Sequence, residues 1–212
     1  MAAEIEIIRE NEIQIVLRKL RGRSIYMIAA LALSTGMRRG ELLGLRWQDI
    51  DLNSGTLRVV QSLEQTKAGL RFKAPKTKHG RRTITLPPSI VAELRTHWKA
   101  QQEQRLALGL GKAPDTALVF PAWDGNPRSP AALTKEWTRA MKGANMKVTL
   151  HALRHTHASS LIAAGVDVLT ISRRLGHASP TITLGAYGHL YSNTDDRAAQ
   201  IMEAMFSRAG TD

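Results

Sequence analysis

Two histidines, an arginine and a tyrosine near the end of the chain have types and spacing suited to phosphodiester chemistry. His151 and Arg154 are three residues apart, His177 follows a Leu-Gly pair, and Tyr187 comes ten residues later. A guanidinium group can bind two non-bridging phosphate oxygens, and an imidazole can donate a hydrogen bond or exchange a proton. A phenol beside these groups could be the nucleophile. The four residues therefore predict a site that attacks a phosphodiester.

The same segment offers a zinc-binding alternative. His151 and His155 are four residues apart, the spacing of a zinc-binding helix. Ala152 stands where the general-base glutamate of such a helix would be, and Arg154 would place a permanent positive charge beside any metal ion. These two features favour a phosphate ligand over zinc. His157 falls among the apolar positions of the predicted helix, which is typical of a structural histidine.

Two phenols, Tyr187 and Tyr191, follow the histidine–arginine segment. A phenol has a pKa near 10, so only about one in a thousand is ionised at neutral pH. An attacking tyrosine therefore needs a proton acceptor and nearby positive charge, and this segment supplies both. Taken alone, either tyrosine would be interpreted as half-buried packing.

The charge balance predicts a polyanionic partner. The chain has 212 residues, with 30 Lys and Arg against 18 Asp and Glu, a formal net charge of +12 and a pI near 10.6. Such a balance is typical of proteins that bind nucleic acid, although charge alone does not exclude a soluble basic protein. Residues 67–82 concentrate this charge and contain no acid. On a β-hairpin they could follow a phosphate backbone, or they could form a solvated edge that resists strand pairing.

Hydrophobic periodicity predicts an α+β fold, mostly α-helical with a small antiparallel β-sheet. The alternating residues 56–63 and 82–86 predict strands, with turns at Gly69 and Gly80. Amphipathic patterns with capping residues predict helices over the remaining segments. Their expected ranges are 5–20, 24–34, 38–45, 89–108, 130–141, 150–164, 168–175, 181–189 and 195–208.

Composition also predicts the compartment. The chain has no Cys, which excludes a disulfide framework and suits a reducing cytoplasm. The longest apolar run, residues 25–33, is too short to span a bilayer, and the acidic N-terminus lacks the order of a secretory signal. We therefore expect a cytoplasmic protein that does not enter a membrane.

The stretch from Glu12 to about Leu190 resembles the catalytic domain of the tyrosine recombinases, the phage integrase family. The segments TGMRRGEL, HALRHTHASS, LGH and TLGAYGHL carry this resemblance. It implies the catalytic-domain fold of that family over a single domain, residues 1–212. It also implies that the helical core-binding domain that precedes the catalytic domain in the family is absent from this chain.

The resemblance assigns roles by position in these motifs. The hairpin lysine falls on Lys76, and Lys78 takes its place if the hairpin is one dipeptide shorter. Glu41 corresponds to the acidic residue that holds the first arginine, and Tyr187 is the nucleophile. The implied catalytic set is Arg38, Lys76, His151, Arg154, His177 and Tyr187, and the expected DNA contacts are Arg39, Lys73, Lys78, Arg81 and Arg82.

The implied activity is site-specific recombination of double-stranded DNA, without a metal or other cofactor. Tyr187 would form a 3′-phosphotyrosyl link, with His151 assisting proton removal and Lys76 protonating the leaving 5′-oxygen. The family resemblance further implies a tetramer on recombination sites, and we expect a monomer in free solution. Two alternatives remain open from the sequence. A type IB topoisomerase uses the same chemistry, and a non-catalytic basic module with helix-turn-helix-like segments would bind DNA without cutting it.

Overall fold

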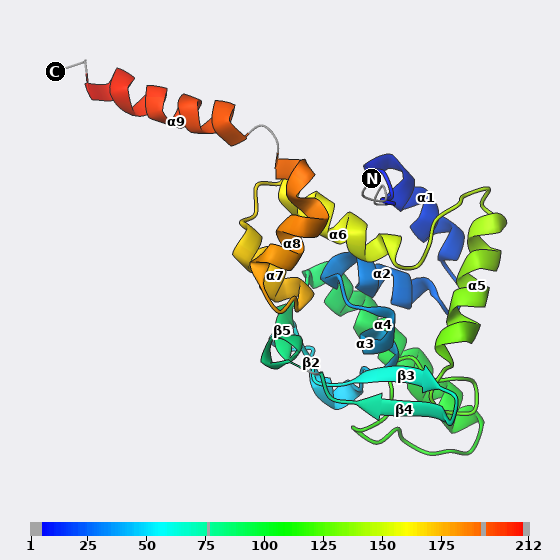
Figure 1. Ribbon diagram of the computed structural model, residues 1–212. Helices are drawn as coiled ribbons and strands as arrows, with labels where there is room; N and C mark the ends of the chain where they lie inside the picture. The colour runs from blue at the N-terminus through cyan, green and yellow to red at the C-terminus, as the bar shows by residue number, and fades with distance from the viewer. Residues whose placement is uncertain (1–5, 76, 192–193, 210–212) are drawn as a thin grey trace.

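The computed structural model describes residues 6–75, 77–191 and 194–209, which form a mostly helical molecule with two small antiparallel sheets (Figure 1). This confirms the predicted fold class. The helices are α1 (Glu10–Leu20), α2 (Tyr26–Thr35), α3 (Arg39–Leu43), α4 (Pro88–Ala107), α5 (Pro130–Lys142), α6 (Ala152–Ala163), α7 (Val168–Leu175), α8 (Pro180–Tyr187) and α9 (Thr194–Ala209). The strands are β1 (Ile50–Asp51), β2 (Thr56–Val59), β3 (Ser62–Thr66), β4 (Gly69–Lys73) and β5 (Arg82–Thr85), and the short 3-10 turns are η1 (Trp47–Asp49), η2 (Lys78–Gly80) and η3 (Gly188–Tyr191).

Helix α2 is the centre of the main core. Its sequence is apolar on every face, and residues 27–32 are all buried. A helix that is apolar all round must be surrounded by other elements. Here α1, α3, α4 and α6 pack against it. The Thr35-Gly36 turn at its end therefore lies inside the molecule, where it can contribute to a site.

Helices α6, α7 and α8 enclose a second, smaller core that contains the predicted nucleophile. Ala158, Ile162, Ile171, Leu175 and Tyr187 form this cluster. Helix α7 is positioned by its N-cap, because the carboxylate of the preceding aspartate accepts a hydrogen bond from the backbone N–H of Thr170 at 2.9 Å. Tyr187 is the last residue of α8, so this packing fixes where its ring lies.

The predicted strand over residues 56–63 is in fact two strands in different sheets. Strand β2 lies between β1 and β5, with Val59 opposite Arg82, whereas β3 pairs with β4, with Ser62 opposite Lys73. The buried residues keep the same alternation on both sides of the break, since Leu57, Val59 and Leu63 are all buried. A pattern of period two therefore cannot reveal where the chain changes partners.

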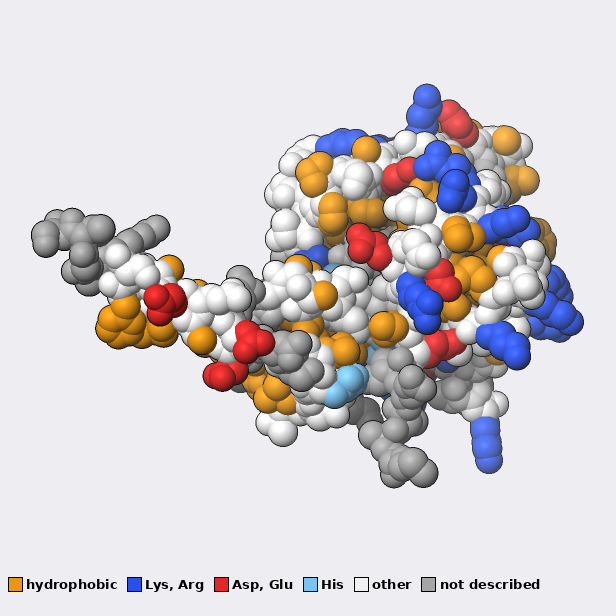
Figure 2. All heavy atoms as spheres, turned by 90° about the horizontal axis from the view of Figure 1, so that it is seen from above, with side chains coloured by type: hydrophobic (Ala, Val, Ile, Leu, Met, Phe, Trp, Pro, Cys, Tyr) orange, Lys and Arg blue, Asp and Glu red, His pale blue; other side chains and the backbone are white. Residues whose placement is uncertain are grey.

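Helix α9 extends away from the rest of the molecule (Figure 1). Its apolar side chains Ile201, Met202, Met205 and Phe206 are between 49% and 70% exposed, and apolar side chains gather along it in Figure 2. Neither α9 nor any other helix of the described residues has the length and apolarity needed to cross a membrane.

Two glycines allow the close approach of α2, α6 and α7. Gly36 and Gly176 end α2 and α7, each with a φ of +67°. A Cβ atom at Gly36 would lie 2.7 Å from side-chain atoms of His157 and Leu175, and one at Gly176 would lie 2.6 Å from the guanidinium of Arg82. Glycine is required at both positions because of the left-handed backbone and because of the space.

We predict that Gly36→Ala lowers the free energy of unfolding by about 2–5 kcal/mol, because the left-handed backbone is strained and the new methyl group collides with two buried side chains. Urea denaturation measures the change. Gly185→Ala is the matched control, since no atom lies within 4 Å of its added Cβ and its helical backbone suits alanine. Equal unfolding free energies for the two variants would contradict this account of the turn.

Candidate active site

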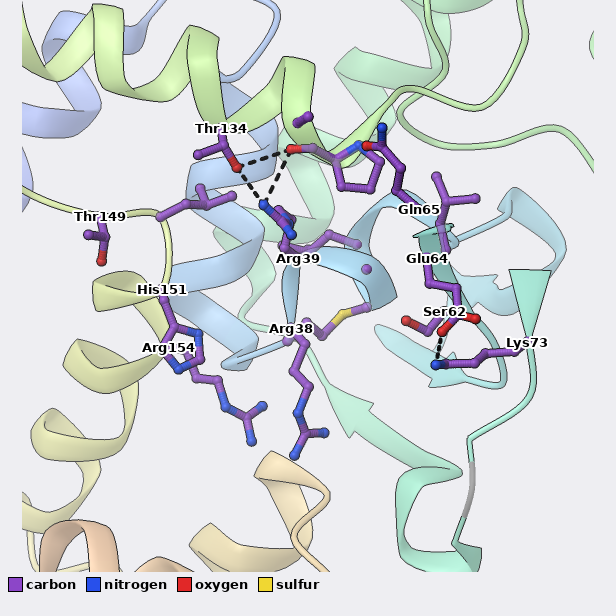
Figure 3. A pocket seen from close by; sticks show the side chains of 17 residues that line it. Arg38, Arg39, Ser62, Glu64, Gln65, Lys73, Thr134, Thr149, His151 and Arg154 are labelled. Carbon is purple, nitrogen blue, oxygen red and sulfur yellow. Dashed lines mark hydrogen bonds and ion pairs between the residues drawn. The ribbon is translucent and has the colours of Figure 1, made fainter. Parts of the chain in front are cut away.

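A cavity of about 700 Å³ opens where α3, the β3–β4 hairpin, α5 and the start of α6 meet. Arg38, Arg39, Lys73, His151 and Arg154 lie in its wall (Figure 3). Residues far apart in sequence thus meet at one basic hollow, which has the size of a ligand pocket. The guanidinium groups of Arg38 and Arg154 lie near each other there and point the same way (Figure 3).

Glu41 holds Arg38 in place, as the sequence predicted. Arg38 precedes α3, and its backbone N–H and Nη1 donate to the two carboxylate oxygens of Glu41 at 2.9 and 3.1 Å. Arg82 approaches the same carboxylate from β5 and donates to both oxygens, at 3.1 and 2.8 Å. The side chains of Arg82 and Glu41 are each 6% exposed, whereas that of Arg38 is 44% exposed. Glu41 therefore anchors one buried and one accessible cation.

This pairing turns Arg82, which the sequence analysis expected to contact DNA, toward the interior of the protein. Besides Glu41, its guanidinium donates to the carbonyl oxygens of Arg174 and Gly80 at 2.7 and 3.2 Å. These partners all lie inside the protein, so we infer that Arg82 positions Glu41. A basic residue within a run of surface cations carries no sequence signal that it turns inward.

The Glu41 carboxyl has a lowered pKa. Burial alone would raise this pKa, but the hydrogen bonds and positive charge of Arg82, followed by those of Arg38, outweigh it. The carboxylate therefore stays ionised and keeps both guanidinium groups in place.

Arg154 is buried, and its neighbours are carbonyl groups rather than carboxylates. Only 4% of the residue is exposed. Its guanidinium donates to the carbonyl oxygens of Gly36 and Leu175, the latter at 2.8 Å. These carbonyls belong to the C-terminal ends of α2 and α7, where the helix dipole carries partial negative charge that favours a cation. Burial, then the charge of Arg38, lowers the pKa of Arg154 to about 9, so it remains positive at neutral pH.

His177 lies directly against Arg154. Its Nε2 is 2.9 Å from Nη2 of Arg154, which can only donate, so Nε2 accepts this hydrogen bond. The proton is then on Nδ1, which donates to the hydroxyl of the buried Thr183 at 2.8 Å. Burial, followed by the charges of Arg154 and Arg38, lowers the pKa of His177 to about 4. The imidazole is therefore neutral, and its unprotonated nitrogen, Nε2, is the one that contacts Arg154.

The phenol of Tyr187 is hydrogen-bonded to His155. The sequence analysis had expected His151 to assist in removing the phenolic proton. The phenol oxygen lies 2.7 Å from Nδ1 of His155, and no hydrogen bond joins it to His151 within the described residues. The residue is 2% exposed, and burial raises the pKa of the phenol against the opposing charge of Arg154. His151 instead lies in the cavity wall beside Arg154. The sequence showed His155 only as a possible zinc ligand.

The basic residues predicted to contact DNA have varied surroundings. Lys73 and Arg71 both form ion pairs with Glu64 of β3. Glu64 lies just before the basic residues 67–82, so the sequence analysis did not consider it as their partner. Arg39 donates to Pro130 and Thr134 at the start of α5. Arg81 is exposed. Lys76 lies outside the described residues, and Lys78 is the first residue of the η2 turn.

Arg174 is a further cation of this region that the sequence analysis did not single out. It donates to Nε2 of His157 at 3.1 Å and to the carbonyl of Ser34 at 2.8 Å. His157 in turn donates from Nδ1 to the carbonyl of Leu33. Burial, followed by the charge of Arg174, lowers the pKa of His157 to about 4. This confirms that His157 is a structural histidine that joins α6 to α2 and α7.

Comparison with known proteins gives consistent relationships. Residues 6–194 match the phage integrase family. Among curated proteins, the chain is 33% identical to a XerC-like tyrosine recombinase of Caldanaerobacter subterraneus subsp. tengcongensis over 96% of this chain and 55% of that protein. It is 30% identical to the ICEBs1 integrase of Bacillus subtilis over 85% of this chain and 48% of that protein. The chain thus spans about half the length of these curated relatives.

Solved structures share the fold. The Tn1549 transposon integrase in complex with a circular intermediate DNA superposes with a TM-score of 0.79 at 23% identity, over 96% of this chain and 67% of that one. The catalytic domain of bacteriophage HP1 integrase superposes with a TM-score of 0.61 at 17% identity, over 93% of this chain and 95% of that one. At these identities the superpositions establish the fold.

We predict that Glu41→Gln lowers the free energy of unfolding at neutral pH by about 3 kcal/mol, because Arg82 loses its buried counter-ion. The folded-state pKa of Glu41 is lowered, so its stabilising contribution is present above the ordinary value of 4.5 and is lost as the pH falls through the folded-state pKa. Urea denaturation across this pH range should show the difference between wild type and variant shrinking in acid.

The matched control is Glu103→Gln, which removes an exposed pair with Lys99 at 3.9 Å. We expect almost no change in unfolding free energy from that variant. A difference between wild type and Glu41→Gln that stays constant or grows as the pH falls would show that the Glu41 carboxylate is not stabilised by its arginines.

Proposed function

The chain belongs to the phage integrase family, and from this premise we propose that it is a site-specific tyrosine recombinase that breaks and rejoins double-stranded DNA. The observation that carries the proposal is the pair of guanidinium groups of Arg38 and Arg154 at one cavity. The neutral His177 is hydrogen-bonded to Arg154, and the phenol of Tyr187 is hydrogen-bonded to His155, the next residue along α6. We propose that residues 1–212 act as the catalytic domain of such an enzyme and that it works in the cytoplasm.

The scissile phosphate would bind between Arg38 and Arg154. Arg38 uses Nη1 and its backbone N–H for Glu41, so its remaining guanidinium N–H groups can donate to a non-bridging oxygen. Arg154 is held rigidly by two carbonyl groups and needs no rearrangement when negative charge develops in the transition state. The charge of a bound phosphate would also favour a protonated His177, which could then donate to an oxygen instead of accepting from Arg154.

Tyr187 would attack the phosphorus atom and form a 3′-phosphotyrosyl link, and a free 5′-hydroxyl would be released. The link conserves the phosphodiester, so a 5′-hydroxyl of a partner strand could reverse the step. Lys76 would protonate the leaving oxygen, and His151 would contact the phosphate from the cavity wall. Arg39, Lys73, Lys78 and Arg81 would contact the DNA backbone. This chemistry requires no metal or other cofactor.

Tyr187→Phe should abolish the covalent protein–DNA adduct on a nicked duplex while DNA binding is retained, because it removes the attacking oxygen and keeps the ring in the core. The adduct is measured on a denaturing gel, in the presence of EDTA. Tyr191→Phe is the matched control and should leave the adduct intact. The assignment is wrong if the adduct survives Tyr187→Phe and disappears in the control.

Lys76→Ala should slow cleavage by about 100-fold or more if this lysine protonates the leaving oxygen. A 5′-bridging phosphorothiolate should then restore the rate, since a thiolate leaves without a proton. Lys78→Ala serves as the comparison in the same single-turnover measurement. Sulfur rescue of Lys78→Ala, without rescue of Lys76→Ala, would transfer the role to Lys78.

The tetramer on recombination sites would use α9. This helix extends from the molecule with its apolar face exposed, so it is available to a neighbouring protomer (Figures 1 and 2). We propose that the chain is monomeric in free solution and assembles through this face on DNA.

Ile201→Asp with Met205→Asp should therefore leave the free monomer as stable as the wild type, because both side chains are exposed, and should reduce tetramer formation on DNA. Light scattering and native gels measure assembly. Gln200→Asp with Ser207→Asp adds the same charge to exposed polar positions of α9 and should have little effect. Unfolding of the monomer by the first pair would show that α9 packs on its own domain.

A further inference from the structure

Among the described residues, His155 is the hydrogen-bond partner of the Tyr187 phenol. Its Nδ1 lies 2.7 Å from the phenol oxygen, and the two rings meet edge to face with centroids 5.7 Å apart. His155 lies on α6 next to Arg154, and Tyr187 ends α8. The contact therefore links the nucleophile to the helix that carries the phosphate-binding arginine.

The direction of this hydrogen bond follows from the partners of the phenol. The phenol is buried, and Nδ1 of His155 is the acceptor within its reach among the described residues, so we infer that its O–H donates to Nδ1. The imidazole must then be neutral, with its proton on Nε2. Burial and the charges of His151 and Arg154 lower the pKa of His155, against the opposing charge of Glu6, which agrees with a neutral ring. An unprotonated nitrogen thus already faces the phenolic proton.

His151 is less well placed for that proton. It lies one helical turn earlier, its ring packs edge to face against His155 with centroids 4.5 Å apart, and its side chain lines the cavity. The ring of His155 thus contacts both the phenol and the ring of His151, and among the described residues no hydrogen bond joins the phenol to His151. The two histidines can therefore have separate roles. His151 lines the cavity where the phosphate would bind, and His155 contacts the phenol of Tyr187.

We propose that His155 is the proton acceptor for Tyr187 in the cleavage step. The inference rests on the proposed recombinase function. As the phenol oxygen bonds to phosphorus, its proton moves to Nδ1 of His155, and the bond from phosphorus to the 5′-oxygen breaks. The general acid gives its proton to that oxygen. One proton is gained by His155 and one is lost by the acid, so the step balances without a redox partner.

The surroundings of His155 make this transfer depend on bound DNA. Arg154 and His151 on α6 oppose an imidazolium, and Glu6, held by hydrogen bonds to the backbone N–H and hydroxyl of Thr149 at 3.1 and 2.8 Å, favours it. A phosphodiester bound at Arg38 and Arg154 would bring a negative charge that offsets the arginines. The free enzyme would then keep a neutral, unreactive tyrosine until the substrate arrives.

The contact can be tested without DNA. The chain contains three tyrosines, so the ¹³Cζ signal of Tyr187 can be identified as the one lost in Tyr187→Phe. We expect this signal to shift in acid as His155 is protonated and the shift to vanish in His155→Ala. An identical titration in wild type and His155→Ala would overturn the proposal, because the phenol would then not be bonded to His155.

The catalytic role is tested by the rate of covalent adduct formation on a nicked duplex carrying the sequence that the protein selects from a randomised pool. His155→Ala should reduce the rate by about 100-fold or more, and added imidazole should restore part of it in proportion to its concentration. A 5′-bridging phosphorothiolate should not restore it, since this substrate bypasses the acid and not the base. Ser160→Ala, at an exposed position on the same helix, is the control and should react like the wild type.

The outcomes separate the two claims. If the wild-type protein forms no adduct on this duplex, the proposed recombinase function fails, and the role of His155 fails with it. If the wild type reacts and His155→Ala reacts equally fast, only the role of His155 is overturned. A slow His155→Ala that phosphorothiolate rescues and imidazole does not would also overturn it. Circular dichroism and thermal unfolding of His155→Ala, and the same assays on His155→Gln, guard against misfolding, because glutamine can accept the hydrogen bond and cannot take the proton.

Discussion

Glu41 accepts hydrogen bonds from two guanidinium groups at once, and the geometry of the candidate site depends on this shared carboxylate. Arg82 occupies both oxygens from the buried side, and Arg38 reaches them from the cavity side. Arg154, a third guanidinium, lies close by and contacts no carboxylate among the described residues. One negative charge is therefore set against three positive charges, and the excess faces the cavity. An anion bound in the cavity would neutralise part of this excess positive charge.

The C-terminal ends of two helices stabilise part of this excess positive charge. The carbonyl groups that hold Arg154 come from the ends of α2 and α7, and both helices close on a left-handed glycine. Small residues at these two turns let the helices approach closely enough for both carbonyls to reach one guanidinium. Packing, backbone conformation and electrostatics are thus coupled at the same point. The burial of α2 on all sides has a functional consequence, because it places a helix C-terminus in the interior.

The motifs that carry the family resemblance predicted one contact of the site directly. In TGMRRGEL the resemblance assigned Glu41 to hold Arg38, and the structure shows this contact. The structure also brings Arg154 and His177 together, although they come from different helices. Local spacing could not reveal that Arg82 turns inward, since its partner Glu41 lies 41 residues away. The contact between His155 and Tyr187, 32 residues apart, depends in the same way on how α6 and α8 pack. The strand break after Val59 was hidden because the buried residues keep the same alternation on both sides of it.

The central claim is that Tyr187 becomes covalently joined to DNA, and mass spectrometry of the trapped complex tests it most directly. Trypsin would release residues 175–197 as one peptide that contains both Tyr187 and Tyr191. After nuclease digestion, the account predicts a nucleotide 3′-phosphate on this peptide, with fragment ions that place it on Tyr187. A nucleotide on Tyr191 or on another residue, or cleaved DNA with no modified peptide, would contradict it.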